Sequence, residues 1–243
     1  MRLTRVHVDS PLATGERVLV TGAAANHIMR VLRLRAGDAI TVFNGRGGEF
    51  SASIEEFHKD SVLIRLHEAR AVERESPLAL TLAQGVSRGE RMDWILQKST
   101  ELGASRIVPV FTERSVVRLD ARQAERKLQH WRGIAVAACE QSGRNRVPEV
   151  AAPIGFHDFI GSAGAQATRL LLSPSGELGI DDLAAVGSGV TVLIGPEGGL
   201  TEIEQESALR AGFTPVRMGP RVLRTETAAL AALTIIQQKF GDL

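Results

Sequence analysis

The spacing of apolar residues changes at Pro77, and this change predicts that the chain folds as two domains. Before Pro77, short runs of β-branched and aromatic residues are separated by turn signals, a pattern typical of a small β-barrel. The charged stretch 69–77 has no apolar periodicity, so we place the linker there. We therefore expect a barrel over residues 1–72 and a second domain over residues 73–243. The expected barrel strands are 6–8, 17–20, 39–43, 50–54 and 62–66.

One helix is expected inside the barrel domain, at residues 26–34. Ile28, Val31 and Leu32 recur at helical spacing and predict one apolar stripe. Cations lie off that stripe, so the helix is expected to present a basic face to solvent. The basic side chains on this helix and just after it are His27, Arg30, Arg33 and Arg35.

After Pro77, short apolar runs alternate with long helical patterns, which predicts an α/β domain with an open parallel sheet. Ser87 with Glu90, and Thr201 with Glu204, have the spacing of capping boxes and predict two helix starts. The longest expected helix is 121–142, and the last expected helix, 226–240, is apolar almost all round. The expected strands are 78–83, 107–111, 168–172, 190–194 and 215–218.

Three loops that directly follow expected strands are candidates for a ligand site. Leu172 is followed by SPSGE, Ile194 by GPEGGL and Met218 by GPRVLRTET. Open parallel sheets bind ligands beyond the carboxyl ends of their strands. Neither the pattern GxGxxG nor a Gly-Lys pair occurs in the chain, which argues against hydrolysis of nucleoside triphosphates. Glu197, inside the second loop, would repel a phosphate, so we expect a neutral or cationic ligand there.

Charged side chains cluster in and near these loops. Arg221 and Arg224 flank an apolar pair in the third loop. Arginine is always protonated in proteins, so these two residues can stabilise negative charge but cannot act as bases. Arg88, in the first turn of its expected helix, would point toward the carboxyl edge of the sheet. Glu140 and Arg144 lie where the longest helix ends in a turn.

Structural roles explain several of these residues without any ligand. Thr225 or Thr227 could cap the last helix. The Arg88 side chain could lie along apolar surface with its charge in water. Cys139 lies on the inner stripe of the longest helix and is expected to be a packed core thiol. Both kinds of interpretation stay open for the arginines and threonines.

Charge is unevenly distributed along the chain, although the formal net charge is only +1. Residues 1–46 carry seven Arg against three acids, residues 84–146 carry twelve Lys and Arg against seven acids, and residues 147–212 carry two Arg against nine acids. Such asymmetry indicates a nucleic-acid surface on part of the molecule. Because aromatic residues make up 4% of the chain and tyrosine is absent, phosphate and shape contacts are favoured over base stacking.

Composition excludes several other classes of protein and site. A single cysteine excludes an intrachain disulfide and a zinc ribbon, and the six scattered His show no metal-ligand spacing, so no metal is expected. No apolar run approaches the roughly 18 residues of a membrane span. The amino terminus lacks the apolar stretch of a secretory signal. We therefore expect a soluble, cytoplasmic protein without a membrane partner.

Five motifs closely resemble the ribosomal RNA small subunit methyltransferase E family. They are ANHIMRVLRLRAGD (25–38), SRGERMDWILQKSTELG (87–103), AACEQSGRNRVPE (137–149), LIGPEGGLTEIE (193–204) and MGPRVLRTETAALAAL (218–233), and the match to which they belong runs in order along essentially the whole chain. The resemblance implies a PUA-like barrel followed by a SPOUT-type α/β domain with a deep trefoil knot, and a homodimer. It also implies that S-adenosylmethionine is the cofactor and that the enzyme methylates N3 of a uridine in small-subunit (16S) ribosomal RNA. We expect the assembled 30S subunit to be the substrate, but the sequence leaves free RNA open as the alternative.

The resemblance also implies roles for residues of the three loops. Backbone groups around Met218 and Leu223 would hold the adenine, and the carboxylate of Glu197 would suit the cationic sulfonium. The implied cofactor-binding residues are Leu172, Ser173, Gly195, Pro196, Glu197, Gly198, Gly199, Met218, Gly219, Leu223, Arg224, Thr225 and Thr227.

For the reaction itself, we expect Arg224 to stabilise the anionic uridine imide, with Arg88 or Arg144 in support. The sequence leaves the identity of the base open. The candidates for it are solvent, Glu140, Glu226 and His27. The side chains expected to contact the RNA backbone are His27, Arg30, Arg33, Arg35, Arg114 and Arg118. Two rival functions also stay open, a non-catalytic RNA-binding assembly factor and a methyltransferase that modifies the ribose 2′-oxygen.

Overall fold

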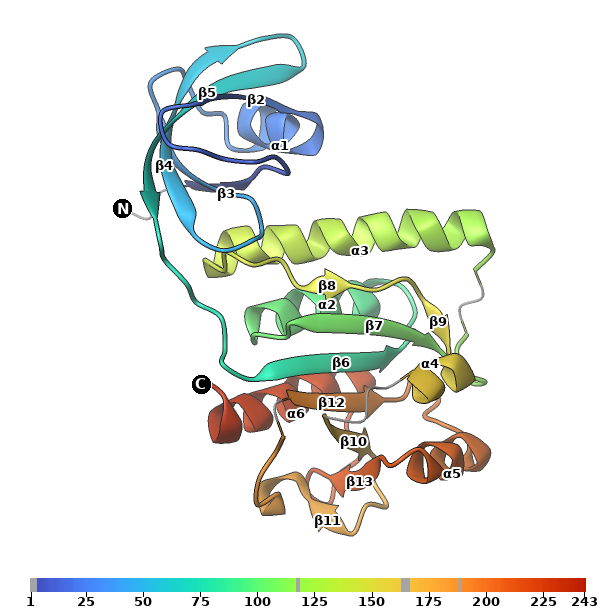
Figure 1. The fold of residues 1–243 in the computed structure, drawn as a ribbon. Helices are drawn as coiled ribbons and strands as arrows, with labels where there is room; N and C mark the ends of the chain where they lie inside the picture. The colour runs from blue at the N-terminus through green and yellow to red at the C-terminus, as the bar shows by residue number, and fades with distance from the viewer. Residues whose placement is uncertain (1–3, 117–118, 163–166, 188) are drawn as a thin grey trace. The chain divides into compact units, whose positions relative to one another are not determined.

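The structure is a computed structural model that describes residues 4–116, 119–162, 167–187 and 189–243 (Figure 1). The chain forms two compact units. The first comprises the residues up to Glu75 together with the segment Cys139–Val147, and the second comprises Ser76–Ala138 and Pro148–Leu243. The division after Glu75 falls within the charged stretch where we placed the linker. The sequence pattern did not predict that Cys139–Val147 belongs to the first unit.

A five-stranded sheet forms the first unit, with the strand order β1-β3-β4-β5-β2. β1 and β3 are parallel neighbours, and the other pairs are antiparallel. Two register shifts between the long strands β4 and β5 mark irregularities of the kind that bend a sheet. All five expected strands are present. Their bounds are β1 Thr4–His7, β2 Arg17–Thr21, β3 Ala39–Phe43, β4 Glu49–Phe57 and β5 Ser61–Arg70.

The helix expected in this unit begins and ends earlier than its sequence pattern predicts. α1 covers Gly22–Asn26, and a π-helical turn, η1, covers His27–Val31. A π-helical turn is wider than an α-helical one, so it changes which residues face the core. Ile28 is buried as expected, but Val31 is 67% exposed, and the prediction of one buried stripe is wrong at that residue. Arg33 then has a φ of 52°, which ends the helical path.

A parallel sheet forms the second unit, with the strand order β11-β13-β10-β12-β6-β7-β8 and with β9 also pairing with β7. Every pairing among its described strands is parallel, which confirms the expected α/β class. The strands are β6 Ala79–Gly85, β7 Arg106–Phe111, β8 Glu149–Val150, β9 Ile154–Gly155, β10 Thr168–Leu172, β11 Leu178–Gly179, β12 Gly189–Ile194 and β13 Thr214–Arg217. The helices after Pro77 are α2 Glu90–Glu101, α3 Ala121–Ser142, α4 Phe156–Ser162, η2 Ile180–Asp182, α5 Glu202–Arg210 and α6 Thr225–Phe240.

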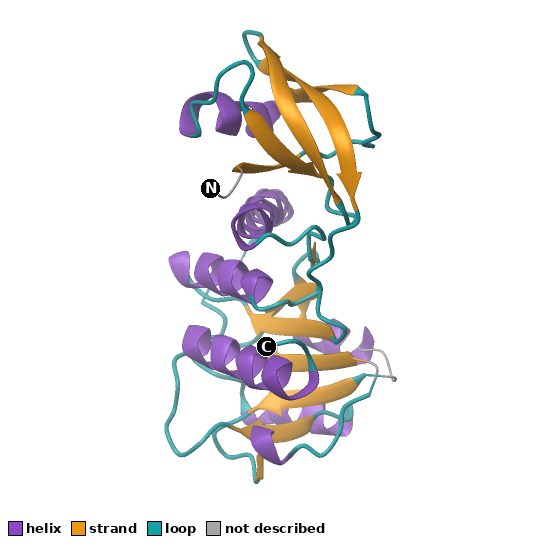
Figure 2. Cartoon of the chain, turned by 90° about the vertical axis from the view of Figure 1, so that its left-hand side faces the viewer, coloured by secondary structure: helices purple, strands orange, loops and turns teal. Residues whose placement is uncertain are grey.

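Helices cover both faces of the parallel sheet (Figure 2). On one face, Val192 of β12 belongs to a buried cluster with Ile95 of α2 and Leu233 of α6. On the other face, the next residue, Leu193, belongs to a cluster with Phe159 of α4. A strand that is buried on both faces has a nearly continuous apolar sequence, which is why β12 was recognisable as a strand of a parallel sheet.

The strand order brings the ends of β13, β10 and β12 next to one another. These are the strands that precede the three candidate loops, so the loops adjoin at one edge of the sheet. The short elements β8, β9, β11, α4 and η2 were not predicted, because two to seven residues carry too little periodicity.

Candidate ligand pocket

A pocket of about 600 Å³ lies in the second unit, beyond the carboxyl ends of β10, β12 and β13. Its volume is in the usual range for small-molecule sites, roughly 300–1,000 Å³. All three candidate loops contribute to its wall. The expected cofactor residues that line it are Leu172, Ser173, Gly195, Pro196, Glu197, Gly198, Gly199, Met218, Gly219, Leu223, Arg224 and Thr225. Thr227 is exposed and does not line the pocket.

The glycine-rich loop 195–200 packs tightly against the end of β6. A Cβ atom on Gly85 would overlap the backbone of Pro196, so only glycine allows the strand and the loop to lie this close. Gly199 has a φ of 68°, and its N–H donates to the carbonyl of Pro196 at 2.9 Å, which closes a tight turn. The glycines therefore bring bare backbone to the pocket wall.

A buried hydrogen-bond cluster joins this loop to the start of α6. Thr225 Oγ1 donates to the carbonyl oxygen of Gly195 at 2.7 Å. The amide of Gln84, which is fully buried, donates to Thr225 Oγ1 at 2.9 Å and to the Gly195 carbonyl at 3.3 Å. The prediction that Thr225 or Thr227 caps α6 is wrong, because the N-cap residue is Arg224 and no side chain caps the helix. Thr225 instead holds two loops of the pocket together.

Ser173, the first residue after β10, ties the first loop to its neighbours. Its backbone N–H donates to the carbonyl of Val216 at 2.9 Å, and its Oγ lies 2.9 Å from Ser175 Oγ. Ser173 Oγ also donates to Gln205 Oε1 at 3.5 Å, while the Gln205 amide donates to the Leu200 carbonyl at 3.2 Å. Side chains of one loop therefore fix the backbone of the next.

Glu197 does not present an unbalanced negative charge to the pocket. Its Oε1 accepts hydrogen bonds from the backbone N–H of Arg88 at 3.0 Å and from Arg91 Nη1 at 2.9 Å. Burial disfavours the charged carboxylate, but these hydrogen bonds and the positive charge of Arg91 outweigh it and hold the pKa of Glu197 below its usual value. Arg91 therefore offsets part of the negative charge on which the expectation of a neutral or cationic ligand rests, and that expectation stays a prediction.

Arg91 is a charged pocket residue that was not predicted from the sequence. The expected Ser87–Glu90 capping box does not form, because Gly89, with a φ of 61°, is the N-cap of α2 and makes no side-chain cap. Ser87 Oγ donates to a carbonyl of the preceding strand instead. Arg91 therefore lies in the first turn of α2 and lines the pocket, whereas Arg88 precedes the helix and contributes only its backbone N–H. A cation in the first turn of a helix interacts unfavourably with the helix dipole. This placement is the sequence feature that could have indicated a role for Arg91 other than stabilising the helix.

Glu226, at the start of α6, completes this charge cluster. Its Oε1 lies 3.9 Å from Arg91 Nε, beyond hydrogen-bond distance. Its Oε2 is buried and has no hydrogen-bond partner among the described residues. Glu197 and Glu226 are the two carboxylates that line the pocket in the described part of the chain. Of the two, Glu226 keeps acceptor capacity that the protein does not use.

Three further arginines line the pocket. Arg114, which we expected to contact RNA, donates from Nη1 to the Gly198 carbonyl at 3.0 Å and so supports the glycine-rich loop. Arg221 and Arg224 are exposed and make no ion pair with any described residue. Val222, between them, is 80% exposed. The third loop therefore presents two free cations around an exposed apolar tip.

Arg144 and Glu140 belong to the first unit and do not line the pocket. Arg144 is 4% exposed, and its Nε donates to Glu75 Oε1 at 3.1 Å. Glu140 Oε1 accepts the backbone N–H of His7 at 2.9 Å. Both side chains hold Cys139–Val147 to other residues of the first unit.

The same segment carries a buried polar network. Arg5 Nη1 donates to Glu49 Oε2 at 2.5 Å, and Arg5 Nη2 donates to Asn145 Oδ1 at 2.5 Å. The Asn145 amide donates in turn to the Val72 carbonyl at 2.6 Å. Burial disfavours the charged form of Glu49, but the hydrogen bonds and charge of Arg5 outweigh it, so the pKa of Glu49 lies below its usual value. Cys139 is buried as expected, and burial raises the pKa of its thiol to about 12, which makes it unreactive.

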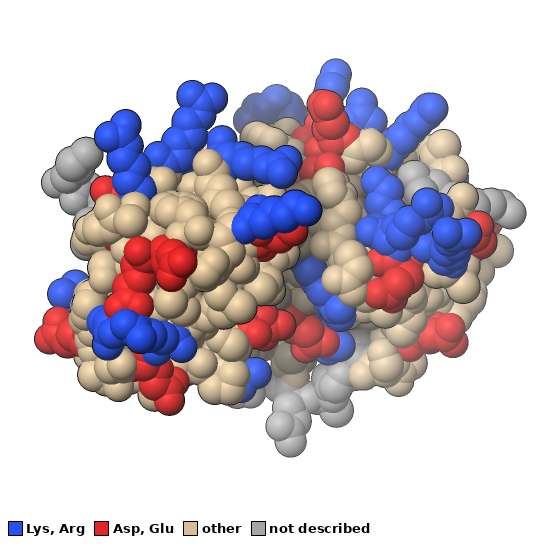
Figure 3. All heavy atoms as spheres, turned by 90° about the horizontal axis from the view of Figure 1, so that it is seen from above, with Lys and Arg blue, Asp and Glu red and all other residues tan. Residues whose placement is uncertain are grey.

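Four of the basic residues expected to contact RNA belong to the first unit. Arg30, Arg33 and Arg35 are exposed and His27 is half-buried. Arg118 lies outside the described residues. On the face drawn in Figure 3, Lys and Arg side chains gather along one margin, with Asp and Glu side chains beside them. The charge asymmetry of the sequence therefore does not become a surface of one sign on that face.

Neither a metal cluster nor a membrane-spanning helix occurs in the described part of the chain. No three His, Cys, Asp or Glu side chains among those residues are placed to hold a metal ion. His130 Nε2 lies 2.8 Å from Asp93 Oδ2. No described helix is long and apolar enough to cross a bilayer.

Comparison with known proteins yields matches over both units. Residues 74–237 match the model of an RNA methyltransferase domain, and residues 20–66 match the model of an RNA methyltransferase PUA domain. The ribosomal RNA small subunit methyltransferase E of Buchnera aphidicola is 34% identical over 242 residues, which cover 100% of this chain and 98% of that protein. A methyltransferase from Legionella pneumophila, solved with bound S-adenosylmethionine, superposes with a TM-score of 0.97 at 39% identity and full coverage of both chains. The ribosomal RNA small subunit methyltransferase E of Neisseria gonorrhoeae, also solved with S-adenosylmethionine, gives a TM-score of 0.92 at 37% identity and full coverage.

Proposed function

Because the chain belongs to the ribosomal RNA small subunit methyltransferase E family, we propose that it transfers a methyl group from S-adenosylmethionine to N3 of a uridine in 16S ribosomal RNA. The observation that carries the proposal is the convergence of three loops on one pocket at the carboxyl edge of a parallel sheet. The relatives solved with S-adenosylmethionine align with this chain over its full length, which supports the choice of donor.

Several finer features belong to the same proposal. We propose that the substrate is the assembled 30S subunit and that the enzyme works in the cytoplasm as a homodimer. We also propose that the second unit contains a trefoil knot around the pocket. The hydrogen bonds from Thr225 and Gln84 to Gly195, which bind the third loop to the second, are consistent with such a compact crossing.

The residues of the pocket fit S-adenosylmethionine. Leu172, Met218 and Leu223 supply apolar wall for the adenine, and backbone groups of their loops can hydrogen-bond its edge. Gly195 and Gly199 allow the backbone to approach the ligand closely. When bound, S-adenosylmethionine supplies an electrophilic methyl group on a positively charged sulfur.

The chain contributes position and charge to the transfer rather than a covalent bond. Methyl transfer to nitrogen requires that donor and acceptor atoms are held in line. The imide nitrogen of uridine reacts as its anion, and Arg224 is placed to stabilise that charge because it lines the pocket, is exposed and has no carboxylate partner among the described residues. Arg221, in the same loop, replaces Arg88 and Arg144 as the supporting cation, since neither of those side chains lines the pocket.

We propose that the RNA backbone is held by basic side chains, four of them in the first unit. His27, Arg30, Arg33 and Arg35 follow one another within nine residues at its surface. If these four residues, together with Arg114 and Arg118, neutralise about six phosphates, affinity for RNA falls by roughly a thousandfold between 50 and 200 mM salt. A filter-binding titration across that range checks this, and a flat salt response would contradict it.

The decisive experiment is nucleoside mass analysis of 30S subunits incubated with the protein and S-adenosylmethionine labelled in its methyl group. The proposal predicts labelled N3-methyluridine. Labelled 2′-O-methyluridine would show instead that the acceptor is the 2′-oxygen of the ribose. Binding of the cofactor without any labelled nucleoside would favour a non-catalytic assembly factor.

A further inference from the structure

The pocket contains one carboxylate whose hydrogen-bonding capacity the protein leaves unused. An ionised carboxylate can accept about four hydrogen bonds. Glu197 accepts two of them from Arg88 and Arg91, whereas no described residue donates a hydrogen bond to Glu226. Burying an acceptor without a partner is unfavourable, so a carboxylate of this kind in a pocket wall is suited to a donor that arrives with the ligand.

We propose that Glu226 accepts the N3 proton of the target uridine; this proposal rests on the proposed function and assigns the base of that reaction. The N3–H bond breaks, and the proton goes to the Glu226 carboxylate. The electron pair left on N3 forms the bond to the methyl carbon, and the sulfur keeps the pair of the bond that breaks. The positive charge on sulfur is neutralised in the same step, so charge and atoms balance without a further reactant.

Three placements favour Glu226 over the other candidate bases. Glu226 lines the pocket, whereas Glu140 and His27 belong to the first unit and do not line it. Glu226 follows Arg224 by two residues at the start of α6, so proton acceptor and anion stabiliser come from one helix start. The side chain of Glu226 is 16% exposed, so the uracil ring of the substrate can approach it.

Arg91 is the positioning residue for this carboxylate. It donates to Glu197 in the glycine-rich loop and lies 3.9 Å from Glu226 Oε1, so it stands between the two carboxylates of the pocket. Its contact with Glu226 is too long for a hydrogen bond. Glu226 is therefore held near a positive charge while neither of its oxygens accepts a hydrogen bond from a described residue.

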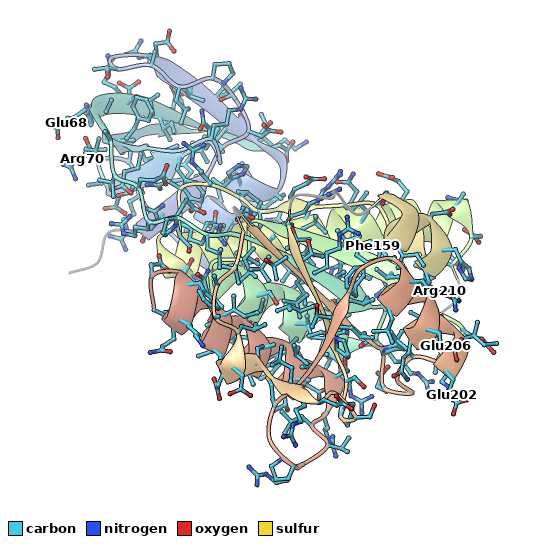
Figure 4. All side chains as sticks on the ribbon, turned by 60° about the horizontal axis from the view of Figure 1, so that its bottom comes forward. Glu68, Arg70, Phe159, Glu202, Glu206 and Arg210 are labelled. Carbon is cyan, nitrogen blue, oxygen red and sulfur yellow. The ribbon has the colours of Figure 1, made fainter. Side chains whose placement is uncertain are left out.

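The test compares Glu226→Gln with a matched control, Glu202→Gln. Glu202 lies in the first turn of α5, is exposed and does not line the pocket; Figure 4 shows it on the same helix as Glu206 and Arg210. We expect Glu226→Gln to lower the single-turnover rate on 30S subunits by about 100-fold, a typical effect of losing a general base. We expect its Kd for S-adenosylmethionine to stay within about threefold of the wild type, and Glu202→Gln to match the wild type in both measurements.

A substrate change separates proton acceptance from other roles of Glu226. A 5-fluoro substituent makes the imide of uridine more acidic, so subunits containing 5-fluorouridine need the base less. The rate deficit of Glu226→Gln should shrink by about tenfold on such subunits. In addition, the rate of Glu226→Gln should rise steadily with pH toward the ionisation of the imide itself, while the wild-type rate changes less over the same range.

Three results would overturn the proposal. The first is an unchanged rate, and the second is an equal deficit on uridine and 5-fluorouridine subunits. The third is a loss of cofactor affinity as large as the loss of rate, which would make Glu226 a cofactor ligand. If Glu226→Gln does not fold, Glu226→Asp keeps the carboxylate, and the proposal then requires its rate to retain the wild-type pH profile. Failure of the proposed function is distinct, because the wild-type protein would then form no N3-methyluridine at all.

Discussion

Arginine and glutamate meet in two clusters of this protein, and the two clusters differ in how completely they are paired. In the first unit, Arg144 donates to both oxygens of Glu75 and is 4% exposed. In the second unit, Arg91 is 45% exposed, pairs with Glu197 and leaves Glu226 without a hydrogen bond among the described residues. The same two residue types therefore make a closed structural contact in one place and an open polar wall in the other.

The difference shows that pairing, rather than residue type, separates structural charges from functional ones. Arg144 follows a helix and a glycine in a motif that resembles a methyltransferase family, and on sequence alone it was as good a catalytic candidate as Arg224. Arg144 proves to be buried with Glu75 as its partner, whereas Arg224 lines the pocket with no carboxylate partner among the described residues. The following predictions test that distinction.

The largest effect on stability is expected for Arg144→Ala. Removing one partner of a buried ion pair leaves the other charge uncompensated, which costs about 3–5 kcal/mol in the free energy of unfolding. Urea unfolding measures the change. Arg146→Ala is the control, because Arg146 pairs with Glu73 at 2.8 Å but is 56% exposed, and its loss should cost less than about 1 kcal/mol. A normal stability combined with lost methyl transfer would return Arg144 to the catalytic candidates.

For Arg224→Ala we expect a smaller effect, and we expect it on the activation free energy of methyl transfer rather than on the free energy of unfolding. Losing one preorganised group that stabilises a developing negative charge costs about 100-fold in rate, or about 2.7 kcal/mol. The unfolding free energy should change by no more than about 0.5 kcal/mol, because Arg224 is exposed. Single-turnover methyl transfer checks the rate, with Arg210→Ala, an exposed cation on α5, as the control. Equal rates for the two variants would contradict the assignment of Arg224.

The smallest expected effect is on the pH dependence of the unfolding free energy, and it comes from Glu49, which pairs with Arg5 in the first unit. Arg5 holds the pKa of Glu49 below its usual value in the folded protein. The stabilisation that this adds is present above the unfolded pKa of about 4.3 and is lost as the pH falls through the folded pKa. The difference in unfolding free energy between wild type and Glu49→Gln should therefore narrow below about pH 4.3.

Urea midpoints measured between pH 6 and pH 3 check this narrowing. Glu68→Gln is the matched control, because Glu68 is 68% exposed and pairs with Arg70 at the surface of the same sheet (Figure 4). Its difference from wild type should stay near zero at every pH. A difference for Glu49→Gln that is equally independent of pH would show that Arg5 does not stabilise the charged form.

Much of the fold was predictable because its apolar runs are long enough to show their period. The bounds expected for β3, β10 and α3 agree with the structure, and the Thr201–Glu204 capping box forms as predicted. The α/β class and the PUA-like amino-terminal domain are confirmed by the sheet topology and the family models. The knot, the dimer and the domain limits stay predictions.

The failures of prediction trace to local backbone geometry that the sequence pattern does not encode. Ser87 and Glu90 have the same spacing as Thr201 and Glu204, but Gly89 takes a left-handed conformation and displaces the helix start. This displacement is why Arg88 was chosen and Arg91 was missed. The pairing of Arg144 with Glu75 joins residues far apart in the sequence, and no local pattern predicts such a contact.

The segment Cys139–Val147 has a consequence for how this protein can change during evolution. Asn145 fills a buried position in the first unit, where it meets Arg5 and Val72, although it is encoded in the middle of the methyltransferase domain. A recombination event that exchanged only the residues before Glu75 would bring in a new Arg5–Glu49 pair without the Cys139–Val147 segment that matches it. The first unit is therefore not an interchangeable module, and its surface is expected to change by substitution rather than by replacement of the whole unit.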